Sequence, residues 1–579
     1  MILLDAYAAR SCPVKVQNEY DPTTPEPSKG VDASVIERFN DITSFKTDHL
    51  DLLATAQGAR DLREAGDQRG RLTAEAVAEG APVIVGPRLP RDETGQRRGH
   101  PDALVRGQDR PDGNPGYHPV QVKKHKVLEK RHPSDPFVWV TPINAPFDAA
   151  LVELSEHSLR SNTERDLIQL AHYVRMLEAA GWAGERQVAG LVSTDRWPEG
   201  LLPEAPQLSG PAIIWVDLTH RHIRTFSRTA DTNWKLRSAI ERYDHEFSFR
   251  LMVAHHAAAR EPDAPYEPRV QPIVVRECET CHWWPVCEPK LGSEDLSLRI
   301  TRSPLDVREI TVLRRLGVST LDDLADADLA QLKGDYLPEV RHRADAEKRL
   351  DVAAQRSRMI RDDVTLARLG DEGPIRRLPS ASIEVDLDIE TSGDGSVYLW
   401  GLLVNDLTTG QPPSYHPFVA WGELDVAGQA ALAAEAMSFL AELHERAGGS
   451  VRVYHYSDYE AVHLRKLAAH DPSGVLAAAV DQIGDTWVDL YELVRANFFG
   501  VNGLGLKVVA VEGPGFGWRD DEPGGLASQT WFSQAIDPTA SPDQAEAARA
   551  RVLDYNEDDV MATFAVRQWL RQTWGATES

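Results

Sequence analysis

Residues 382–390 read Ser-Ile-Glu-Val-Asp-Leu-Asp-Ile-Glu, and this alternation of apolar and acidic side chains predicts a β-strand. Side chains of a strand point alternately to its two faces, so four carboxylates share one face. An edge strand facing solvent would give the same pattern. However, the turn at 392–395 and the apolar run 397–404 favour a hairpin of internal strands, since such a run is typical of a buried strand. Clustered carboxylates repel one another unless water or cations screen them, which makes Asp388 and Glu390, at the strand end, candidate metal ligands.

Two later segments carry matching residue types. Residues 453–460 read Val-Tyr-His-Tyr-Ser-Asp-Tyr-Glu and end in Glu460, with Asp458 nearby. Tyr555 and Asp559 lie one helical turn apart. Together with the end of the first strand, these segments resemble the three motifs of DnaQ-like exonucleases of the DEDD type, in the tyrosine subtype. Glu460 stands where that family has an aspartate.

This resemblance covers residues 381–570 and implies an RNase H-like domain, a mixed sheet with flanking helices, that acts as a 3′–5′ exonuclease. Residues 488–491 and 505–507 also resemble segments of the family. In such enzymes two divalent metals, Mg²⁺ or Mn²⁺, activate water and stabilise the leaving oxygen. The resemblance implies that Tyr555 orients the water and that the metals are held by Asp388, Glu390, Glu460 and Asp559.

The four cysteines of the chain are Cys12, Cys278, Cys281 and Cys287, and the last three are bunched. Cys-x-x-Cys followed by a third cysteine has metal-ligand spacing, and four thiolates suit a [4Fe–4S] cluster or a tetrahedral zinc ion. Unrelated buried cysteines are the alternative. A disulfide scaffold is not expected in a long intracellular chain.

One cysteine near the start and three near the end of a nuclease domain is the layout of iron–sulfur RecB-like nucleases. Residues 8–13 and 278–287 resemble the two cysteine segments of that family, and the resemblance extends over residues 1–290. It implies a [4Fe–4S] cluster that clasps the two ends of the domain. Because such a clasp closes a very long loop, a structural role suits it better than a redox role.

Nucleases of the PD-(D/E)xK superfamily hold Mg²⁺ with an acid on one strand and an acid-x-Lys on the next. After a helix expected over 60–79 and a strand at 83–85, Asp102 begins one such strand, and residues 118–123 form the next, with Gln121 and Lys123 at its end. Gln121 replaces the usual acid. Its amide offers an oxygen but no charge, so metal affinity should fall. The first-motif acid is ambiguous: Glu75 is the candidate, with Glu79 as the alternative.

Gln169 and Tyr173 lie four residues apart on one face of a predicted helix. They resemble the Gln-x-x-x-Tyr signature of RecB-like nucleases, which contacts DNA near the site. Residues 123–132 read Lys-Lys-His-Lys-Val-Leu-Glu-Lys-Arg-His and supply local positive charge, with Lys124 and Lys126 as candidate DNA contacts. A solvated charge run on a loop explains this segment equally well.

Residues 291–370 read as helical and charged, with Ser319 or Thr320 capping a helix. This stretch resembles helix–hairpin–helix modules that hold DNA backbones; a plain connector is the alternative. Residues 370–374, Gly-Asp-Glu-Gly-Pro, predict a break. The predicted fold class is α/β multidomain: a restriction-endonuclease-like RecB core with an iron–sulfur clasp over 1–290, a helical connector over 291–375, and an RNase H-like domain over 376–579.

The composition limits location and partners. A net charge of −26 over 579 residues excludes a protein that coats nucleic acid through overall charge, but allows a nuclease with a local basic groove. Neither a signal peptide nor an apolar run of roughly 18 residues is evident, so we expect a cytoplasmic protein that binds no membrane. The sequence shows no pattern of a motor, serine hydrolase or zinc protease.

The leading interpretation is therefore a metal-dependent nuclease that acts on single-stranded DNA or DNA ends in repair, recombination or defence, with RNA as an alternative substrate. In a second interpretation only the C-terminal exonuclease cuts, and the RecB-like domain is an iron–sulfur DNA clamp. In a third, the chain is a non-catalytic nucleic-acid-binding adaptor for a helicase.

Overall fold

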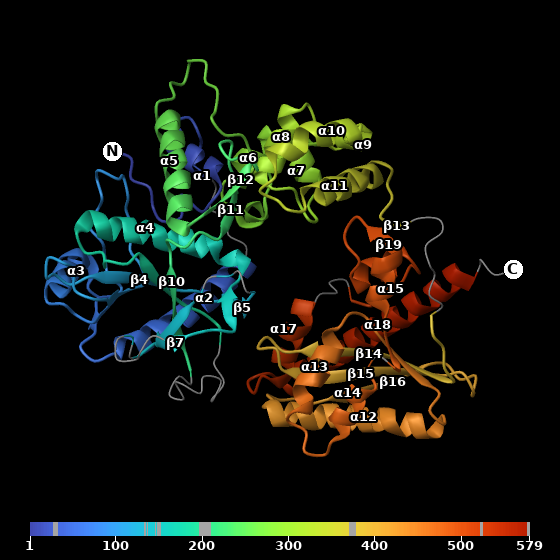
Figure 1. Cartoon of the computed structure of the whole chain (residues 1–579). Helices are drawn as coiled ribbons and strands as arrows, with labels where there is room; N and C mark the ends of the chain where they lie inside the picture. Colours follow the sequence, from blue (N-terminus) through green and yellow to red (C-terminus); the bar gives the residue numbers. More distant parts are fainter. Residues whose placement is uncertain are drawn as a thin grey trace. The chain divides into compact units, whose positions relative to one another are not determined.

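The computed structural model describes the chain except for residues 27–32, 133–134, 136, 145, 147–151, 196–209, 370–377, 484, 521–524 and 576–579. The chain divides by packing into two compact units, Met1–Gln355 and Arg356–Ser579 (Figure 1). The domain boundaries expected at residues 290 and 375 stay predictions, and the break expected at 370–374 lies outside the described residues. None of the described helices combines the length and the apolar character needed to span a membrane.

The first unit is built on a mixed sheet whose eight described strands have the order β1-β2-β3-β4-β9-β10-β6-β7. Strands β2, β3 and β4 form an antiparallel meander; helix α4 follows, and β9 then pairs parallel to β4. The strands are β1 (Arg60–Asp61), β2 (Val83–Val85), β3 (Ala103–Arg106), β4 (Tyr117–Val122), β6 (Trp139–Pro142), β7 (Val152–Glu153), β9 (Val188–Val192) and β10 (Ala212–Asp217).

Helices cover both faces of this sheet because its strands are apolar on both sides. In β10, Ile214 and Val216 join the core formed with α4 (Glu164–Ala180) and α5 (Ala239–Ala258), whereas Ile213 and Trp215 join the core formed with α2 (Ala33–Ala54). The unit also contains α1 (Pro13–Tyr20), α3 (Arg69–Ala78), α6 (Trp284–Cys287), the pairs β5 (Leu128–Lys130) with β8 (His157–Leu159) and β11 (Ile223–Phe226) with β12 (Trp234–Arg237), and the 3-10 helices η1 (Gly66–Gln68), η2 (Ser161–Thr163), η3 (Arg276–Thr280) and η4 (Glu288–Lys290).

The helix expected over 60–79 is wrong in its first half. Arg60 and Asp61 instead form β1, which pairs parallel to β2. Gly66, the first residue of η1, has φ of +52°, a left-handed conformation that favours glycine and that interrupts a continuous α-helix. The helix α3 begins only at Arg69.

The helical character predicted for residues 291–370 is found over most of 296–361, but Leu366–Arg368 form a strand, β13, which pairs with Phe498–Gly500. Thr320 caps one of the helices: its side chain accepts a hydrogen bond from the Asp323 backbone N–H, and Asp323 in turn accepts one from the Thr320 N–H. These elements are α7 (Leu296–Arg299), α8 (Val307–Arg315), α9 (Leu321–Asp326), α10 (Leu329–Tyr336), η5 (Leu337–Glu339) and α11 (Ala346–Arg361).

The second unit is built on a five-stranded sheet of order β16-β15-β14-β17-β18. In this sheet β15 pairs antiparallel with both β14 and β16, whereas β17 pairs parallel with both β14 and β18. Its elements are β13 (Leu366–Arg368), β14 (Ile383–Thr391), β15 (Val397–Asp406), β16 (Ser414–Val419), α12 (Val426–Arg446), β17 (Val451–His455), α13 (Tyr459–Ala468), α14 (Val475–Asp481), β18 (Trp487–Asp489), α15 (Leu490–Asn497), β19 (Phe498–Gly500), α16 (Leu506–Glu512), α17 (Gly525–Ile536) and α18 (Pro542–Gly575).

The predicted alternation of β14 is confirmed, and β14 is the middle strand rather than an edge strand. Its four apolar side chains pack in one core with α12, while its acids face the other side, where α18 lies (Figure 1). Two of these acids are neutralised by arginines of α18. Arg567 pairs with Glu384 and, through two hydrogen bonds of 2.6 and 2.9 Å, with Asp386; all three side chains are fully buried.

Arg571 adds a second contact to Glu384, at 2.5 Å, from a more exposed position. Burial raises the pKa of Asp386 in spite of Arg567, so this charge network depends on its arginine. The strand is therefore held against α18 at one end by ion pairs, and its other two acids, Asp388 and Glu390, are left to form a site.

Replacing Arg567 with Met should destabilise the second unit strongly. Removing one partner of a buried ion pair leaves an uncompensated charge, which costs about 3–5 kcal/mol of unfolding free energy. Chemical denaturation of the full chain measures this loss. Arg571→Met, at the partly exposed position, should cost less, and adding Asp386→Asn to Arg567→Met should recover part of the loss. Equal stability of Arg567→Met and the wild type would contradict this role.

Candidate functional site

Three carboxylates from two elements converge at the end of β14. Asp388 and Glu390 come from the strand, and Asp559 comes from α18. Each offers one oxygen, and the three oxygens lie within 4.8 Å of one another. Among the described residues this is the group of acids, histidines or cysteines gathered closely enough to hold a metal ion.

The surroundings of this group disfavour three negative charges. Glu390 and Asp559 are buried, while Asp388 is partly exposed and opens the group to solvent. Burial and the neighbouring charge of Asp559 raise the pKa of Glu390 to about 8 and the pKa of Asp388 well above its usual value. Burial also raises the pKa of Asp559, although Lys507 opposes the shift.

Glu460, the acid of the second motif, lies close to this group but outside it. Its charge contributes to the raised pKa of Asp388, so the two carboxylates are neighbours. Glu460 is only 3 % exposed, and its Oε2 has no hydrogen-bond partner among the described residues. His455 Nδ1 lies 3.6 Å from this oxygen. Asp458, in contrast, is exposed and pairs with Arg465 at 3.3 Å.

A strained turn places Glu460. Ser457, between β17 and α13, has a backbone φ of +93°, which residues other than glycine rarely adopt. The Asp489 carboxylate, at the end of β18, accepts a hydrogen bond from the Ser457 N–H at 3.1 Å and holds the turn. Strain of this kind is typical of functional sites, where surrounding contacts maintain it.

Several residues that sequence reasoning did not assign as site residues hold the carboxylates in place. Asn556 Nδ2 donates to Asp388 at 2.8 Å, Ser528 Oγ donates to Glu390 at 2.7 Å, and Trp518 Nε1 donates to Asp559 at 2.7 Å. Asn556 lies inside the recognised segment 555–559, so a signal for it was present. Ser528 and Trp518 come from α17 and the loop before it, and nothing in their local sequence marks them.

Glycine at position 401 makes room for the Asn556 contact. Gly401 pairs with Asp388 across the β14–β15 ladder. A Cβ atom there would lie 1.7 Å from Asn556 Oδ1, far inside van der Waals contact. Tyr415 then completes the amide's hydrogen bonds by donating to Oδ1 at 2.8 Å.

Lys507 brings positive charge to the acids. Its Nζ donates to the Tyr555 hydroxyl oxygen at 2.6 Å and lies 4.6 Å from the centre of the tyrosine ring. Its charge lowers the pKa of Asp388, Glu390 and Asp559 against the effect of burial. The segment 505–507 was singled out in the sequence, but the contact with Tyr555 was not predicted.

The donor set fits a divalent metal ion. Carboxylate oxygens are the preferred ligands of Mg²⁺ and Mn²⁺. Carboxylates gathered this closely repel one another, and a metal ion would supply positive charge between them. The buried Glu460 oxygen without a hydrogen-bond donor is a further unsatisfied ligand atom beside the group.

In the first unit, the structure brings Asp102 and Gln121 together at the ends of β3 and β4. With its amide oriented so that both groups find partners, Gln121 Nε2 donates to Asp102 at 3.2 Å. The Val122 N–H also donates to Asp102, at 2.9 Å, and Lys46 of α2 pairs with it at 2.5 Å. Asp102 is thus well supplied with partners, and Lys46 is a site neighbour that the sequence did not indicate.

Lys123 turns toward the predicted Gln-x-x-x-Tyr helix. Its Nζ donates to Gln169 at 2.7 Å and pairs with Asp166 at 3.0 Å, both on α4. Gln169 Nε2 in turn donates to the Tyr173 hydroxyl at 3.3 Å, which confirms that these residues share a helix face. Burial lowers the pKa of Lys123, although Asp166 opposes the shift.

Asp166 is the acid at the centre of this second cluster, and sequence reasoning missed it. Burial raises its pKa, but His125, Lys123 and Arg10 lower it to about 2. Asp166 and Gln169 are one helical turn apart, a spacing that could have been noticed beside the Gln-x-x-x-Tyr pattern.

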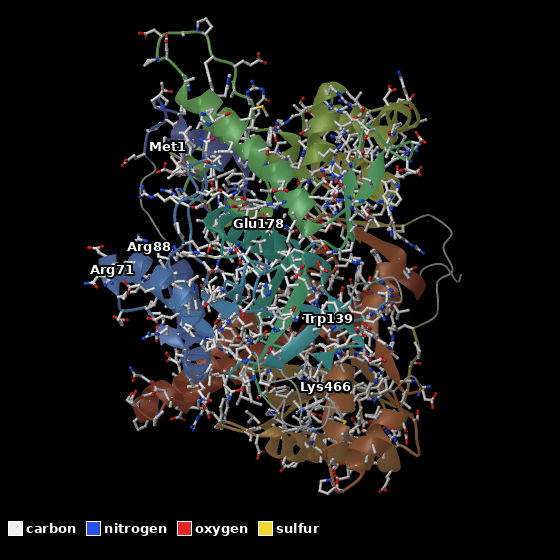
Figure 2. All side chains as sticks on the ribbon, turned by 60° about the vertical axis from the view of Figure 1, so that its left-hand side comes forward. Met1, Arg71, Arg88, Trp139, Glu178 and Lys466 are labelled. Carbon is white, nitrogen blue, oxygen red and sulfur yellow. The ribbon has the colours of Figure 1, made fainter. Side chains whose placement is uncertain are left out.

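The candidate first-motif acids lie elsewhere. Glu75 is exposed on α3 and pairs with Arg71, whose side chain points outward (Figure 2). Glu79 pairs with Arg60 on the surface. No described contact joins either residue to Asp102, because both occupy the solvent side of α3, whose buried side carries Thr73 and Ala76. Lys124 and Lys126 are exposed after β4, as a DNA contact requires.

All four cysteines line one cavity. Cys12 precedes α1, and the other three lie in η3, at its end and in α6, more than 260 positions later in the chain. Asn18 donates to Cys287 Sγ at 3.6 Å, and the Cys12 N–H donates to Glu277 at 3.2 Å. Burial raises the pKa of the Cys12 thiol to about 11, so a thiolate there needs a positive partner.

Comparison with known proteins finds a match for the second unit alone. Residues 385–571 match the sequence model of a family described as the RNase H superfamily. No curated protein and no solved structure matches the chain.

Proposed function

We propose that this chain is a metal-dependent nuclease whose second unit removes nucleotides from the 3′ end of DNA. The observation that carries the proposal is the carboxylate group Asp388, Glu390 and Asp559 at the end of β14, inside the segment that matches the RNase H superfamily. An RNase H-like domain implies a nucleic-acid substrate and phosphodiester hydrolysis with divalent metals.

In this proposal Asp388, Glu390, Glu460 and Asp559 hold Mg²⁺ or Mn²⁺. Bound metal supplies activation of water and stabilisation of charge on the phosphate and leaving oxygen. Asn556, Ser528 and Trp518 keep three of the carboxylates oriented through their hydrogen bonds. Tyr555 orients the attacking water, and Lys507 fixes the tyrosine by donating to its oxygen. The release of mononucleotides in the 3′–5′ direction follows the resemblance of the three motifs.

A substitution series tests the exonuclease. Asp388→Ala and Asp559→Ala should each lower the rate of degradation by about 10²–10³, since each removes an electrostatic contribution to transition-state stabilisation. Tyr555→Phe should cost less than Asp559→Ala, because it keeps the ring and the ligands and loses only a hydroxyl. A single-stranded oligonucleotide labelled at its 5′ end, incubated with Mn²⁺ and resolved by gel, measures rate and direction.

Asp458→Ala is the matched control, because this acid lies two residues before Glu460 but is exposed and paired with Arg465. It should degrade the strand as the wild type does, and EDTA should stop both proteins. Undiminished degradation by Asp388→Ala and Asp559→Ala would refute the assignment of this site.

We further propose that the first unit is a RecB-like domain that grips DNA. The order of its core, an antiparallel β2–β3–β4 meander, α4 and a parallel β9, supports a restriction-endonuclease-like fold. The gathering of Asp102, Gln121, Lys123 and Gln169 around the ends of β3 and β4 supports a site there. Its neutral Gln121 and the Lys46–Asp102 ion pair favour a clamp with weak cutting or none.

This choice between a clamp and a second nuclease can be measured in an Asp388→Ala background. Any cutting that survives there should disappear with Lys123→Ala and increase with Gln121→Glu, which restores the missing charge. The clamp form of the proposal expects no residual cutting at any Mn²⁺ concentration, with binding of labelled DNA retained. Vigorous Lys123-dependent cutting would make the first unit an active nuclease instead.

We also propose that the four cysteines hold a [4Fe–4S] cluster. Their common cavity supports a shared ligand. The resemblance of residues 8–13 and 278–287 to iron–sulfur RecB-like nucleases favours the cluster over a zinc ion.

Protein purified without oxygen should contain iron and sulfide in about equal amounts, close to four of each per chain. Cys281→Ser should lose the iron and destabilise the first unit, while the second unit keeps its exonuclease activity. If the protein instead contained one equivalent of zinc and no iron, the cluster proposal would be wrong and the cysteines would form a structural zinc site.

A further inference from the structure

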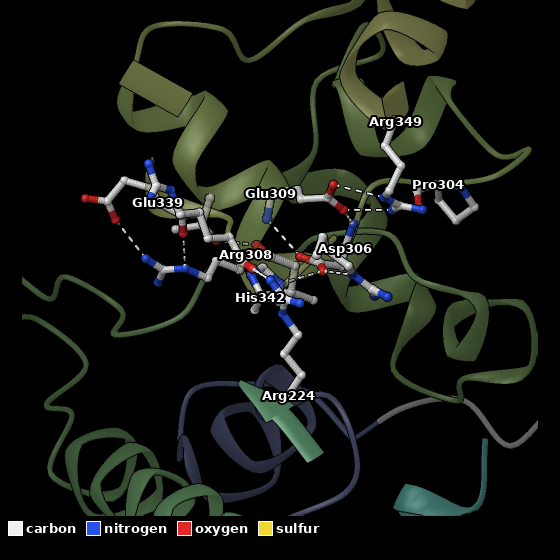
Figure 3. A network of polar contacts seen from close by, with 12 residues as sticks. Arg224, Pro304, Asp306, Arg308, Glu309, Glu339, His342 and Arg349 are labelled. Atoms are coloured by element: carbon white, nitrogen blue, oxygen red, sulfur yellow. Dashed lines mark hydrogen bonds and ion pairs between the residues drawn. The ribbon is translucent and has the colours of Figure 1, made fainter. Parts of the chain in front are cut away.

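A hairpin and a helical segment of the first unit form a basic surface that the sites above do not use. Strand β11 carries Arg224 and Phe226 on the side where α8 and the loop before α11 lie, and Arg228 follows the strand in the connection to β12. Arg308 of α8 stacks its guanidinium 3.3 Å from the Phe226 ring centre, and Arg224 donates to the Arg341 backbone oxygen at 2.7 Å. Figure 3 shows Arg224 reaching from the hairpin toward this network.

Three acids of this surface are paired with cations. Asp306 pairs with Arg343 at 2.8 Å and with His342, Glu339 pairs with Arg308 at 2.7 Å and with Arg315, and Glu347 pairs with Lys333. Arg224, Arg228 and Arg341 have no acidic partner among the described residues, and all three are exposed. Burial lowers the pKa of Arg308, and the neighbouring charges of Arg228 and Arg315 lower it further, whereas Glu339 opposes the shift.

A cavity of about 340 Å³ lies at the centre of the surface. Its lining includes Arg224, Arg341 and Arg343, together with Trp234, whose ring carries the Arg224 guanidinium 3.9 Å from its centre. Guanidinium groups bind phosphates, and an aromatic–arginine stack offers a flat surface for a base. An acidic polypeptide would use the arginines but not the stack.

We propose that this surface binds the backbone of a single-stranded nucleic acid, with one base against the Trp234–Arg224 stack. The inference rests on the proposed nucleic-acid substrate. In a chain of net charge −26, positive charge this concentrated gives a strand a local attraction that the molecule as a whole lacks. The surface therefore supplies affinity for the strand and takes no part in hydrolysis.

Binding is measured by fluorescence anisotropy with a labelled 20-nucleotide strand, on the full chain carrying Asp388→Ala so that the strand stays intact. Arg228→Glu and Arg341→Glu should each weaken binding about 3- to 10-fold at 150 mM salt and reduce the slope of log Kd against log salt by about 1, as loss of a phosphate contact does. Arg269→Glu, at an exposed arginine on the loop after α5, is the charge-matched control and should change neither.

Trp234→Ala should weaken binding of the normal strand but not of an abasic strand of equal length. Unchanged affinity and salt slope in both Arg228→Glu and Arg341→Glu would overturn the inference, as would binding of a poly-glutamate peptide that depends on Arg341 while strand binding does not. If these variants bind like the control but Asp388→Ala still abolishes degradation in the wild-type background, the inference fails and the proposed function stands.

Discussion

Four carboxylates on one buried face of β14 are the constraint around which the second unit is organised. Like charges so close cannot all be buried without compensation, and the unit resolves them in two ways. Glu384 and Asp386 receive Arg567 and Arg571 from α18, which fixes the helix against the sheet. Asp388 and Glu390 meet Asp559 of the same helix, so the contacts that pack α18 also bring the third carboxylate into place. Structure and candidate chemistry thus depend on one strand–helix pairing.

Residues that are distant in the sequence donate hydrogen bonds that orient the carboxylates of this site. Asn556 reaches Asp388 because position 401 is glycine, and Lys507 and Trp518 approach Tyr555 and Asp559 from outside the sheet. The first unit uses a parallel arrangement in which Lys123, Gln169 and Asp166 share one network between β4 and α4. In both units the end of a strand faces a helix that carries further residues of the site. The position of that helix therefore determines the geometry of the site.

Sequence reasoning reached the features that are periodic or local. The alternation of β14, the hairpin to β15, the turn of helix joining Tyr555 to Asp559, and the helix face of Gln169 and Tyr173 all follow from spacing alone, and the structure has each of them. It failed where distant segments meet. Ser528, Trp518, Lys46 and Asp166 carry no local pattern, and Glu75 was chosen for its residue type although its side of α3 faces solvent. The false helical start at residue 60 ignored Gly66, whose left-handed backbone ends any such helix.

The cysteine arrangement also has a consequence in time. Cys12 leaves the ribosome well before its neighbours in the cavity, which come after residue 277. At a synthesis rate of about 5–20 residues per second, roughly 13–53 s pass between the synthesis of Cys12 and that of Cys278. Helix α1 likewise packs against α5, which begins more than 200 positions later in the chain. The cysteine cavity is therefore completed late in the synthesis of the first unit, from segments that lie far apart in the chain.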